Sequence, residues 1–296
     1  MNITYIIGLL IVFFILGYFS RAKKSIAVEH FESGVQLKEC NEPKTIYDTF
    51  YSNLYDELFR SKAREQFEAL QIREVCMKSY DGKIKILDIG CGMGHTCDLF
   101  NQYKYNVVGL DISPKMLEKA KINYPLLEFV EGDMTRPDNF EPKSFTHVTC
   151  LFYSIYYCDN IHQVFENVNQ WLVPEGYFTI HIVDKRKFDP VLERSSSLIP
   201  LYNPQRFGRK TQTTLKFSDF NYKADWNLEG TPTRFTEIFT FNNNKVRKNN
   251  HSLYIYTMKK FVDTAENTGF KLINTTDMAI VNHPYNYLFT FQKRFG

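Results

Sequence analysis

Short apolar runs alternate with amphipathic stretches between residues 83 and 185 of the chain. One run ends at Ile89 and a second covers Val107–Leu110, while Phe145–Tyr153 and Tyr177–Val183 continue the series. Apolar runs of this length are typical of strands buried on both faces, and their alternation with helical spacing is typical of parallel sheets. The pattern therefore predicts an α/β domain with a doubly wound, mostly parallel sheet of seven strands.

Before this series, apolar residues recur at a spacing of four. The row from Ile46 to Leu58 predicts helix over residues 45–72, and Tyr47, Tyr51 and Tyr55 form a second, parallel row. After the series, polar and apolar residues alternate over Thr213–Trp226 and Thr233–Phe241, which predicts an antiparallel β insertion over about residues 190–253. Residues 258–268 then have helical spacing, and residues 271–279 and 287–293 are typical of a closing antiparallel pair.

The first segment of the chain has a different pattern. Residues 3–19 are almost wholly apolar and would span ~26 Å as a helix, which is enough for a thin bilayer. Arg21, Lys23 and Lys24 follow directly, whereas a cleaved signal peptide carries its charge before the apolar run. We expect an uncleaved transmembrane anchor over residues 1–20, with a cleaved signal or a helix lying on the membrane or buried in protein as alternatives. The basic flank predicts that the rest of the chain lies in the cytosol.

Domain boundaries follow from these patterns. Residues 21–44 are polar, of mixed charge and without sustained periodicity, which predicts a cytosolic tether. Residues 45–296 then form one domain with a sizeable core. The net charge of +3 gives no general nucleic-acid footprint, so no nucleic-acid partner is expected. Six cysteines without C-x-x-C pairs argue against zinc and against a disulfide framework, and they fit a reducing compartment.

Three glycines at a spacing of two follow the first apolar run: Gly90, Gly92 and Gly94. Glycine permits positive φ and leaves no Cβ between the backbone and a ligand. The spacing differs from that of dinucleotide-binding and phosphate loops. Asp88 precedes the turn, and an acid there suits a cationic or hydroxyl-bearing ligand better than a pyrophosphate. Taken alone, the three glycines could also form a tight structural turn of the kind found in any α/β protein.

With the segments that follow it, this turn resembles motif I of the class I S-adenosylmethionine-dependent methyltransferases. Later positions match the family in order: Asp111 ends the second strand, Ser113 and Pro114 begin a helix, and Asp133 follows the third strand. The resemblance covers about residues 45–185 and 255–293. It implies that S-adenosylmethionine is the cofactor, with Asp111 at the ribose hydroxyls and Asp133 at the adenine. The implied cofactor residues are Asp88, Gly90, Cys91, Gly92, Gly94, Asp111, Ile112, Met116, Asp133, Met134 and Leu151.

Candidate catalytic residues are Tyr51, Tyr153 and His181. In related methyltransferases an N-terminal helix covers cofactor and substrate with tyrosines facing inward, although both rows of this helix could be packing faces. Tyr153 lies at the end of the fourth strand, where ligands bind in open α/β sheets. His181 near the end of the fifth strand could act as a base or could be a sheet residue without a chemical role.

The chain is thus identified as a membrane-anchored methyltransferase with a small-molecule or lipid-like acceptor at the cytosolic face. A protein methyltransferase acting on membrane-proximal proteins is one alternative. A catalytically inactive scaffold that kept the cofactor-binding fold is the other. An acceptor pocket closed by the insertion would favour a small substrate, an open cleft would favour protein, and a filled cofactor cleft would favour the scaffold.

Overall fold

The computed structural model describes residues 29, 31, 36–78, 80–190 and 211–294. The anchor predicted for residues 1–20 and most of the tether predicted for residues 21–44 lie outside the described residues. Within the described residues, every helix is too short or too polar to cross a bilayer.

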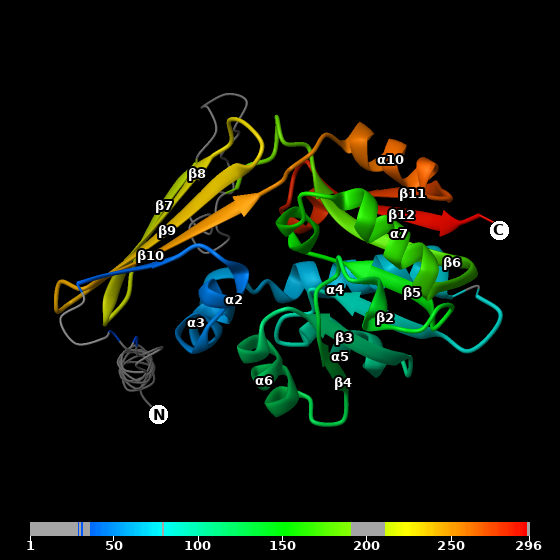
Figure 1. The fold of residues 1–296 in the computed structure, drawn as a ribbon, viewed down its shortest axis with the longest axis horizontal. Helices are drawn as coiled ribbons and strands as arrows, with labels where there is room; N and C mark the ends of the chain where they lie inside the picture. The colour runs from blue at the N-terminus through cyan, green and yellow to red at the C-terminus, as the bar shows by residue number, and fades with distance from the viewer. Residues whose placement is uncertain (1–28, 30, 32–35, 79, 191–210, 295–296) are drawn as a thin grey trace, which may run out of the picture.

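A seven-stranded sheet forms the larger body of the molecule (Figure 1). Its order is β11-β12-β6-β5-β2-β3-β4; the five strands from β6 to β4 are joined by parallel pairs, while β12 is antiparallel to β6 and to β11. The predicted α/β domain is confirmed, and the sheet is mixed because the last two strands form a hairpin at its edge. The strands are β2 (Lys85–Ile89), β3 (Asn106–Asp111), β4 (Glu128–Glu131), β5 (Phe145–Cys150), β6 (Leu172–Val183), β11 (Phe270–Asp277) and β12 (Asn286–Lys293).

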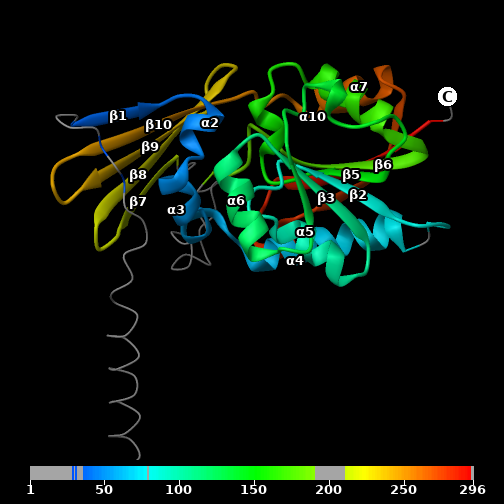
Figure 2. The same cartoon turned by 60° about the horizontal axis from the view of Figure 1, so that its bottom comes forward.

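Helices cover both faces of this sheet (Figure 2). Helices α4 and α5 lie on one face, and α7 and α10 pack against each other on the opposite face. Helix α6 packs against β3 and β4 and also contacts α3. Ser113 caps α6 as predicted, because its side chain accepts a hydrogen bond from the Met116 amide. These helices are α4 (Lys62–Ile72), α5 (His95–Gln102), α6 (Pro114–Asn123), α7 (Ile161–Trp171) and α10 (Met258–Asn267).

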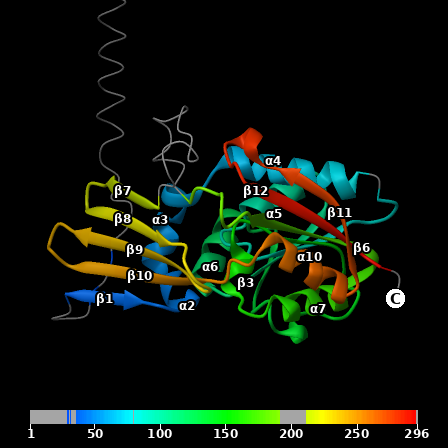
Figure 3. The same cartoon turned by 90° about the horizontal axis from the view of Figure 1, so that it is seen from above.

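A second, five-stranded sheet of order β1-β10-β9-β8-β7 lies at one end of the larger body (Figure 3). The insertion supplies four antiparallel strands, and β1 joins them in parallel at the edge. The predicted strand over Thr213–Trp226 is divided into two, because the chain turns at Phe217, whose amide donates to the carbonyl of Phe220. The strands are β1 (Leu37–Cys40), β7 (Gln212–Lys216), β8 (Phe220–Asn227), β9 (Thr233–Phe241) and β10 (Val246–Leu253).

Strand β1 lies within the stretch predicted as a tether, so that prediction is wrong for its last residues. Leu37–Cys40 is a strand because one side of its backbone pairs with β10, although its own sequence has no sustained alternation of polar and apolar residues. Two short helices, α2 (Pro43–Ile46) and α3 (Thr49–Phe59), follow and pack against the second sheet. The guanidinium of Arg247 on β10 donates to the Ile46 carbonyl at 2.8 Å, and its charged carbon lies 4.9 Å from the centre of the Phe50 ring.

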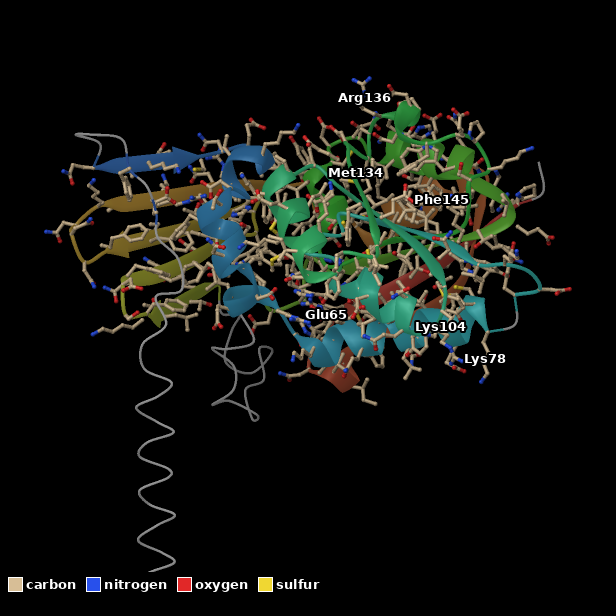
Figure 4. The ribbon with its side chains drawn as sticks, turned by 90° about the horizontal axis from the view of Figure 1, so that it is seen from below. Glu65, Lys78, Lys104, Met134, Arg136 and Phe145 are labelled. Atoms are coloured by element: carbon tan, nitrogen blue, oxygen red, sulfur yellow. The ribbon has the colours of Figure 1, made fainter. Side chains whose placement is uncertain are left out.

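The carboxyl ends of the parallel strands face α2, α3 and the second sheet. Figure 4 shows Met134, which follows β4, on that side of the larger body, while Phe145, which begins β5, and Lys104, which precedes β3, lie toward the opposite end. Arg136 projects outward from the loop after β4. Ligands of open α/β sheets bind outside the carboxyl ends of the strands, so a ligand site is expected at this boundary.

Candidate active site

One cavity of about 460 Å³ lies at this boundary. One part of its wall comes from the loops after β2, β3 and β4, and another from α2, α3 and the strands β8 to β10. Its volume falls in the usual range for small-molecule sites. The predicted site residues that line it are Tyr51, Gly90, Gly92, Asp111, Ile112, Met116, Asp133, Met134 and Tyr153.

The glycine turn after β2 forms the floor of the cavity. Gly90 and Gly92 both have positive φ, at 68° and 54°. A Cβ at Gly90 would lie 2.3 Å from the Ser154 hydroxyl oxygen, so a larger residue there would force the loop after β5 to move. The turn thus needs glycine both for its backbone conformation and for this close approach.

Asp111 ends β3 with its carboxylate held by the backbone. Its Oδ2 accepts from the Gly92 amide at 2.9 Å, and its Oδ1 accepts from the Ser113 amide at 2.8 Å. Burial raises the pKa of Asp111 above its usual value, and these amides oppose that shift. Since a carboxylate accepts up to four hydrogen bonds, these backbone amides leave acceptor capacity for a hydroxyl.

Asp133 and Met134 lie in the loop after β4, on the cavity wall. Oδ1 of Asp133 accepts from both the amide and the hydroxyl of Thr135, at 2.9 and 2.8 Å, which fixes the turn. Met134 packs against the main core with part of its side chain accessible. Ile112 and Met116 complete this end of the cavity, with Met116 almost fully buried.

This donor set fits S-adenosylmethionine. Asp111 would hold the ribose hydroxyls, Asp133 with Met134 would hold the adenine, and the turn at Gly90 and Gly92 leaves room for the chain of the cofactor. When bound, the cofactor supplies a methyl group on a positively charged sulfur.

Four predicted cofactor residues do not line the cavity. Asp88 is buried beneath the turn, where its carboxylate accepts from the Thr149 hydroxyl at 2.8 Å and from the Cys97 thiol at 3.5 Å. Cys91, Gly94 and Leu151 likewise face the domain interior, where they pack against the main sheet and its helices. A strand that ends in a tight turn points successive side chains to opposite sides, so position alone did not separate cavity from core.

His181 is not at the cavity either. Both ring nitrogens have partners in the core: Nδ1 lies 2.8 Å from Glu68 Oε1 and Nε2 lies 3.0 Å from Asn286 Oδ1. The ring and the carboxylate are fully buried, and the pair ties helix α4 to the sheet. Of the two interpretations of this residue, its place in the core favours the structural one.

The tyrosine row of α2 and α3 faces the cavity. Tyr47, Tyr51 and Tyr55 all line it, while Ile46 and Leu54 of the other row are buried in the core. Tyr153 lies across the cavity with a positive φ of 66°, and its hydroxyl lies 3.4 Å from Asn286 Oδ1.

Sequence analysis missed the polar residues of the second sheet. His251 on β10 lines the cavity, and its Nε2 lies 2.8 Å from Oε2 of Glu237 on β9. Glu237 stands between Phe235 and Phe239 in a strand of period two, so the sequence places a carboxylate on an apolar face. This acid on an apolar face was the sequence signal for a polar cluster, because a buried carboxylate requires a hydrogen-bonding partner.

Comparisons with known proteins agree with this site. Residues 87–180 match a family model described as a methyltransferase domain. An uncharacterized protein of Methanocaldococcus jannaschii is 32% identical over 143 residues, which cover 48% of this chain and 51% of the relative.

Two solved structures share the fold. An S-adenosylmethionine-dependent methyltransferase from Clostridium acetobutylicum has a TM-score of 0.61 and 17% identity, covering 83% of this chain and 96% of its own. The sugar N-methyltransferase KedS8 from Streptoalloteichus sp. has a TM-score of 0.61 and 18% identity, covering 90% and 100%.

The family model supports a methyltransferase domain over residues 87–180, and the two solved structures show that the fold is shared. The chain spans 51% and 61% of the length of the first two curated relatives it matches.

Proposed function

We propose that the chain transfers the methyl group of S-adenosylmethionine to a small-molecule acceptor bound in the cavity. The observation that carries this proposal is the continuity of one cavity from Asp111 and Asp133, at the strand ends, to Trp226 and Phe235 of the second sheet. One part suits the cofactor, and the other is walled by stacked aromatic rings, with 4.3 Å between the centres of Trp226 and Phe235. The aromatic part of the cavity favours transfer from a cationic donor that becomes neutral.

The cover over the cavity favours a small or lipid-like acceptor over a protein. Helix α3 and strands β8 to β10 both contribute to its wall, so a bulky polypeptide would meet them before reaching the strand ends. The cavity is also open space rather than packed side chains, which argues against a scaffold whose cofactor cleft has filled in.

Cofactor binding by the full chain tests the proposal. We expect micromolar affinity for S-adenosylmethionine and S-adenosylhomocysteine, roughly −8 kcal/mol. Asp111→Ala should weaken binding by about 1–3 kcal/mol, because the ribose hydroxyls lose a charged acceptor. Asp138→Ala, in the exposed loop after β4, is the matched control and should bind normally. Calorimetry that shows no heat and no thermal shift with either ligand would remove the enzyme function.

We also propose that the chain acts at the cytosolic face of a membrane. The support is the sequence of residues 3–19 with Arg21, Lys23 and Lys24 after it. A glycosylation acceptor placed between residues 21 and 28 should stay unmodified in a microsomal insertion assay, whereas efficient glycosylation there would contradict the proposed orientation.

A further inference from the structure

Four polar side chains from separate parts of the chain form a continuous hydrogen-bond chain that reaches the cavity. Glu237 Oε2 lies 2.8 Å from His251 Nε2, and His251 Nδ1 lies 2.6 Å from the Tyr157 hydroxyl. The Tyr157 hydroxyl in turn lies 2.9 Å from the Tyr47 hydroxyl. His251, Tyr157 and Tyr47 line the cavity, while Glu237 is fully buried behind them. We name these four residues the relay.

The chemistry of its inner end sets the direction of the relay. An ionised carboxylate only accepts hydrogen bonds, so Nε2 of His251 carries the proton that points to Glu237. Nδ1 is then a lone pair that accepts from the Tyr157 hydroxyl. The Tyr157 oxygen in turn accepts from the Tyr47 hydroxyl, whose own oxygen keeps a lone pair. The relay is therefore oriented to receive a proton at Tyr47 and to store it on His251.

Glu237 is held as a carboxylate despite its burial. Burial alone would raise its pKa, but hydrogen bonds, above all the one from His251, lower it below the usual value. Tyr222 donates to its Oε1 at 2.8 Å and the Asn249 amide donates to its Oε2 at 3.1 Å. Arg247 Nε donates to Asn249 Oδ1 at 2.9 Å and so orients that amide.

Both tyrosines of the relay stay protonated. Burial raises the pKa of Tyr47 and of Tyr157, so neither hydroxyl ionises near neutral pH and each can only pass a proton on. The titratable groups that face His251 come from β9, from the loop after β5, from α2–α3 and, through Glu237, from β8. They are Glu237, Tyr157, Tyr47, Tyr51 and Tyr222.

The outer end of the relay lies beside the proposed cofactor site. The Ser113 hydroxyl donates to the Tyr47 carbonyl at 2.7 Å, and the Ser113 amide donates to Asp111. One short loop thus links Tyr47 to the residue expected to hold the ribose. An acceptor between Tyr47 and the cofactor would therefore meet the relay and the methyl group together.

The charge of the cavity favours a cationic acceptor. Among its described lining residues, Arg64 is the one guanidinium or ammonium group, and its charge is shared with Glu65 and Glu68. Five acidic residues line the cavity, and Glu237 of the relay adds a sixth carboxylate behind His251. A negative, aromatic cavity attracts ammonium groups and disfavours carboxylates. The five are Glu42, Asp111, Asp133, Asp159 and Asp189.

Resting on the proposed function, we propose that the acceptor is a small-molecule amine and that the relay removes its proton before methyl transfer. An ammonium ion has no lone pair and cannot attack a methyl group. A carboxylate acceptor, in contrast, would need no base. The relay gives the cavity a property that only a nucleophile carrying a proton requires.

Deprotonation of the ammonium comes first, and methyl transfer follows. The N–H bond of the ammonium breaks, its electron pair stays on nitrogen, and the proton goes to the Tyr47 oxygen. The Tyr47 proton moves to Tyr157 and the Tyr157 proton to His251 Nδ1, which becomes an imidazolium paired with Glu237. The amine nitrogen then bonds to the methyl carbon, the C–S bond breaks, and its electron pair goes to sulfur. The products are a methylated ammonium, S-adenosylhomocysteine and a protonated His251.

Matched probes test the acceptor class with the full chain. The full chain is incubated with methyl-labelled S-adenosylmethionine and two series of probes, each an amine, an alcohol and a carboxylate on one skeleton. The series are benzylamine, benzyl alcohol and benzoate, and glucosamine, glucose and glucuronate. We expect label in the amines alone. Label that prefers a hydroxyl or a carboxylate probe, or that enters no amine although the cofactor binds, overturns the relay proposal. Absence of cofactor binding would instead be a failure of the proposed function.

Variants of the relay separate proton transfer from structure. Tyr157→Phe and Glu237→Gln should each lower kcat by about 10²-fold or more near neutral pH, the usual size of general-base effects. The deficit should shrink as the pH rises toward the pKa of the probe amine, since the amine then arrives neutral. A deficit that does not change with pH would assign the relay a merely structural role and overturn the proposal. Tyr256→Phe is the control and should keep wild-type rates, because its hydroxyl donates to the Asp159 carbonyl away from the relay.

A measurement without turnover completes the test. Histidine ¹⁵N NMR of the full chain should show His251 with its proton on Nε2 and an accepting Nδ1, and Glu237→Gln should abolish that preference. A proton on Nδ1 of the neutral ring would reverse the direction of the relay and overturn the proposal.

Discussion

The described part of the chain contains two buried histidine–glutamate pairs with the same contact distance and different surroundings. His181 and Glu68 meet at 2.8 Å in the larger body, and His251 and Glu237 meet at 2.8 Å in the second sheet. The ring nitrogen of His181 that does not contact Glu68 lies against the Asn286 amide oxygen in the core. The corresponding nitrogen of His251 lies against the Tyr157 hydroxyl on the cavity wall.

This difference shows that burial and pairing do not identify a catalytic histidine. Both Glu68 and Glu237 have pKa values below the usual one: burial raises each pKa, but the hydrogen bonds and charges around each carboxylate together outweigh it. What differs is the group at the second ring nitrogen: Asn286 Oδ1, which also accepts from the Tyr153 hydroxyl, only accepts hydrogen bonds and cannot pass a proton on, whereas the Tyr157 hydroxyl can. His181 stabilises the join between α4 and the sheet, and His251 is available to a bound molecule.

Removing the histidines should separate the pairs by stability. His181→Ala leaves Glu68 in the core with Arg64 Nε, at 3.7 Å, as an ion-pair partner, so we expect a loss of about 3–5 kcal/mol in the free energy of unfolding. His251→Ala leaves Glu237 with Tyr222 and Asn249, so the loss should be about 1–3 kcal/mol. Urea unfolding of both variants measures these losses, and equal losses would contradict the proposed difference between the two pairs.

A third buried acid, Asp88, has Thr149 and Cys97 rather than a histidine as its partners, and its effect on stability should depend on pH with the opposite sign. Burial raises the pKa of Asp88 to about 7, although Thr149 and Cys97 oppose the shift. A raised folded-state pKa means that the stabilising contribution is complete below the unfolded value of about 3.9 and is lost as the pH rises through about 7. Asp88→Asn should therefore raise the free energy of unfolding by about 1–2 kcal/mol above pH ~7.

The same substitution should have almost no effect near pH ~4, where the native carboxyl is already protonated. Melting temperatures of wild type and Asp88→Asn across the pH range provide the measurement. A gain that is the same at both ends of the range would show that the effect does not come from ionisation. Glu68 and Glu237 have the opposite sign, because stability from a depressed pKa is present above the unfolded value of about 4.3 and is lost as the pH falls.

Local patterns in the sequence predicted the cofactor half of the site. The turn at Gly90 and Gly92, the strand-end Asp111 and the loop at Asp133 are each fixed by residues within a few positions, and all line the cavity. The same patterns included Asp88 and His181, which lie in the core, because strand ends alternate between cavity and interior.

The relay could not be predicted in this way, because its members are far apart in the chain. Tyr157 and His251 are 94 positions apart, and Tyr47 and Tyr157 are 110 apart. The polar residues Arg247, Asn249 and His251 alternate along β10 in a pattern that is typical of a solvent-facing side, yet all three are buried.

The sequence by itself determined the α/β series, the Ser113 cap and the glycine turn, because these depend on short-range sterics and on the period of apolar residues. Only the tertiary structure decided which face of the second sheet meets α2 and α3, and so which polar groups were buried together. The register of β9 against β10 places Glu237 opposite Asn249 and two residues from the partner of His251. A buried carboxylate is tolerated only where such partners converge on it, and that convergence is a property of the packed sheet rather than of any one segment.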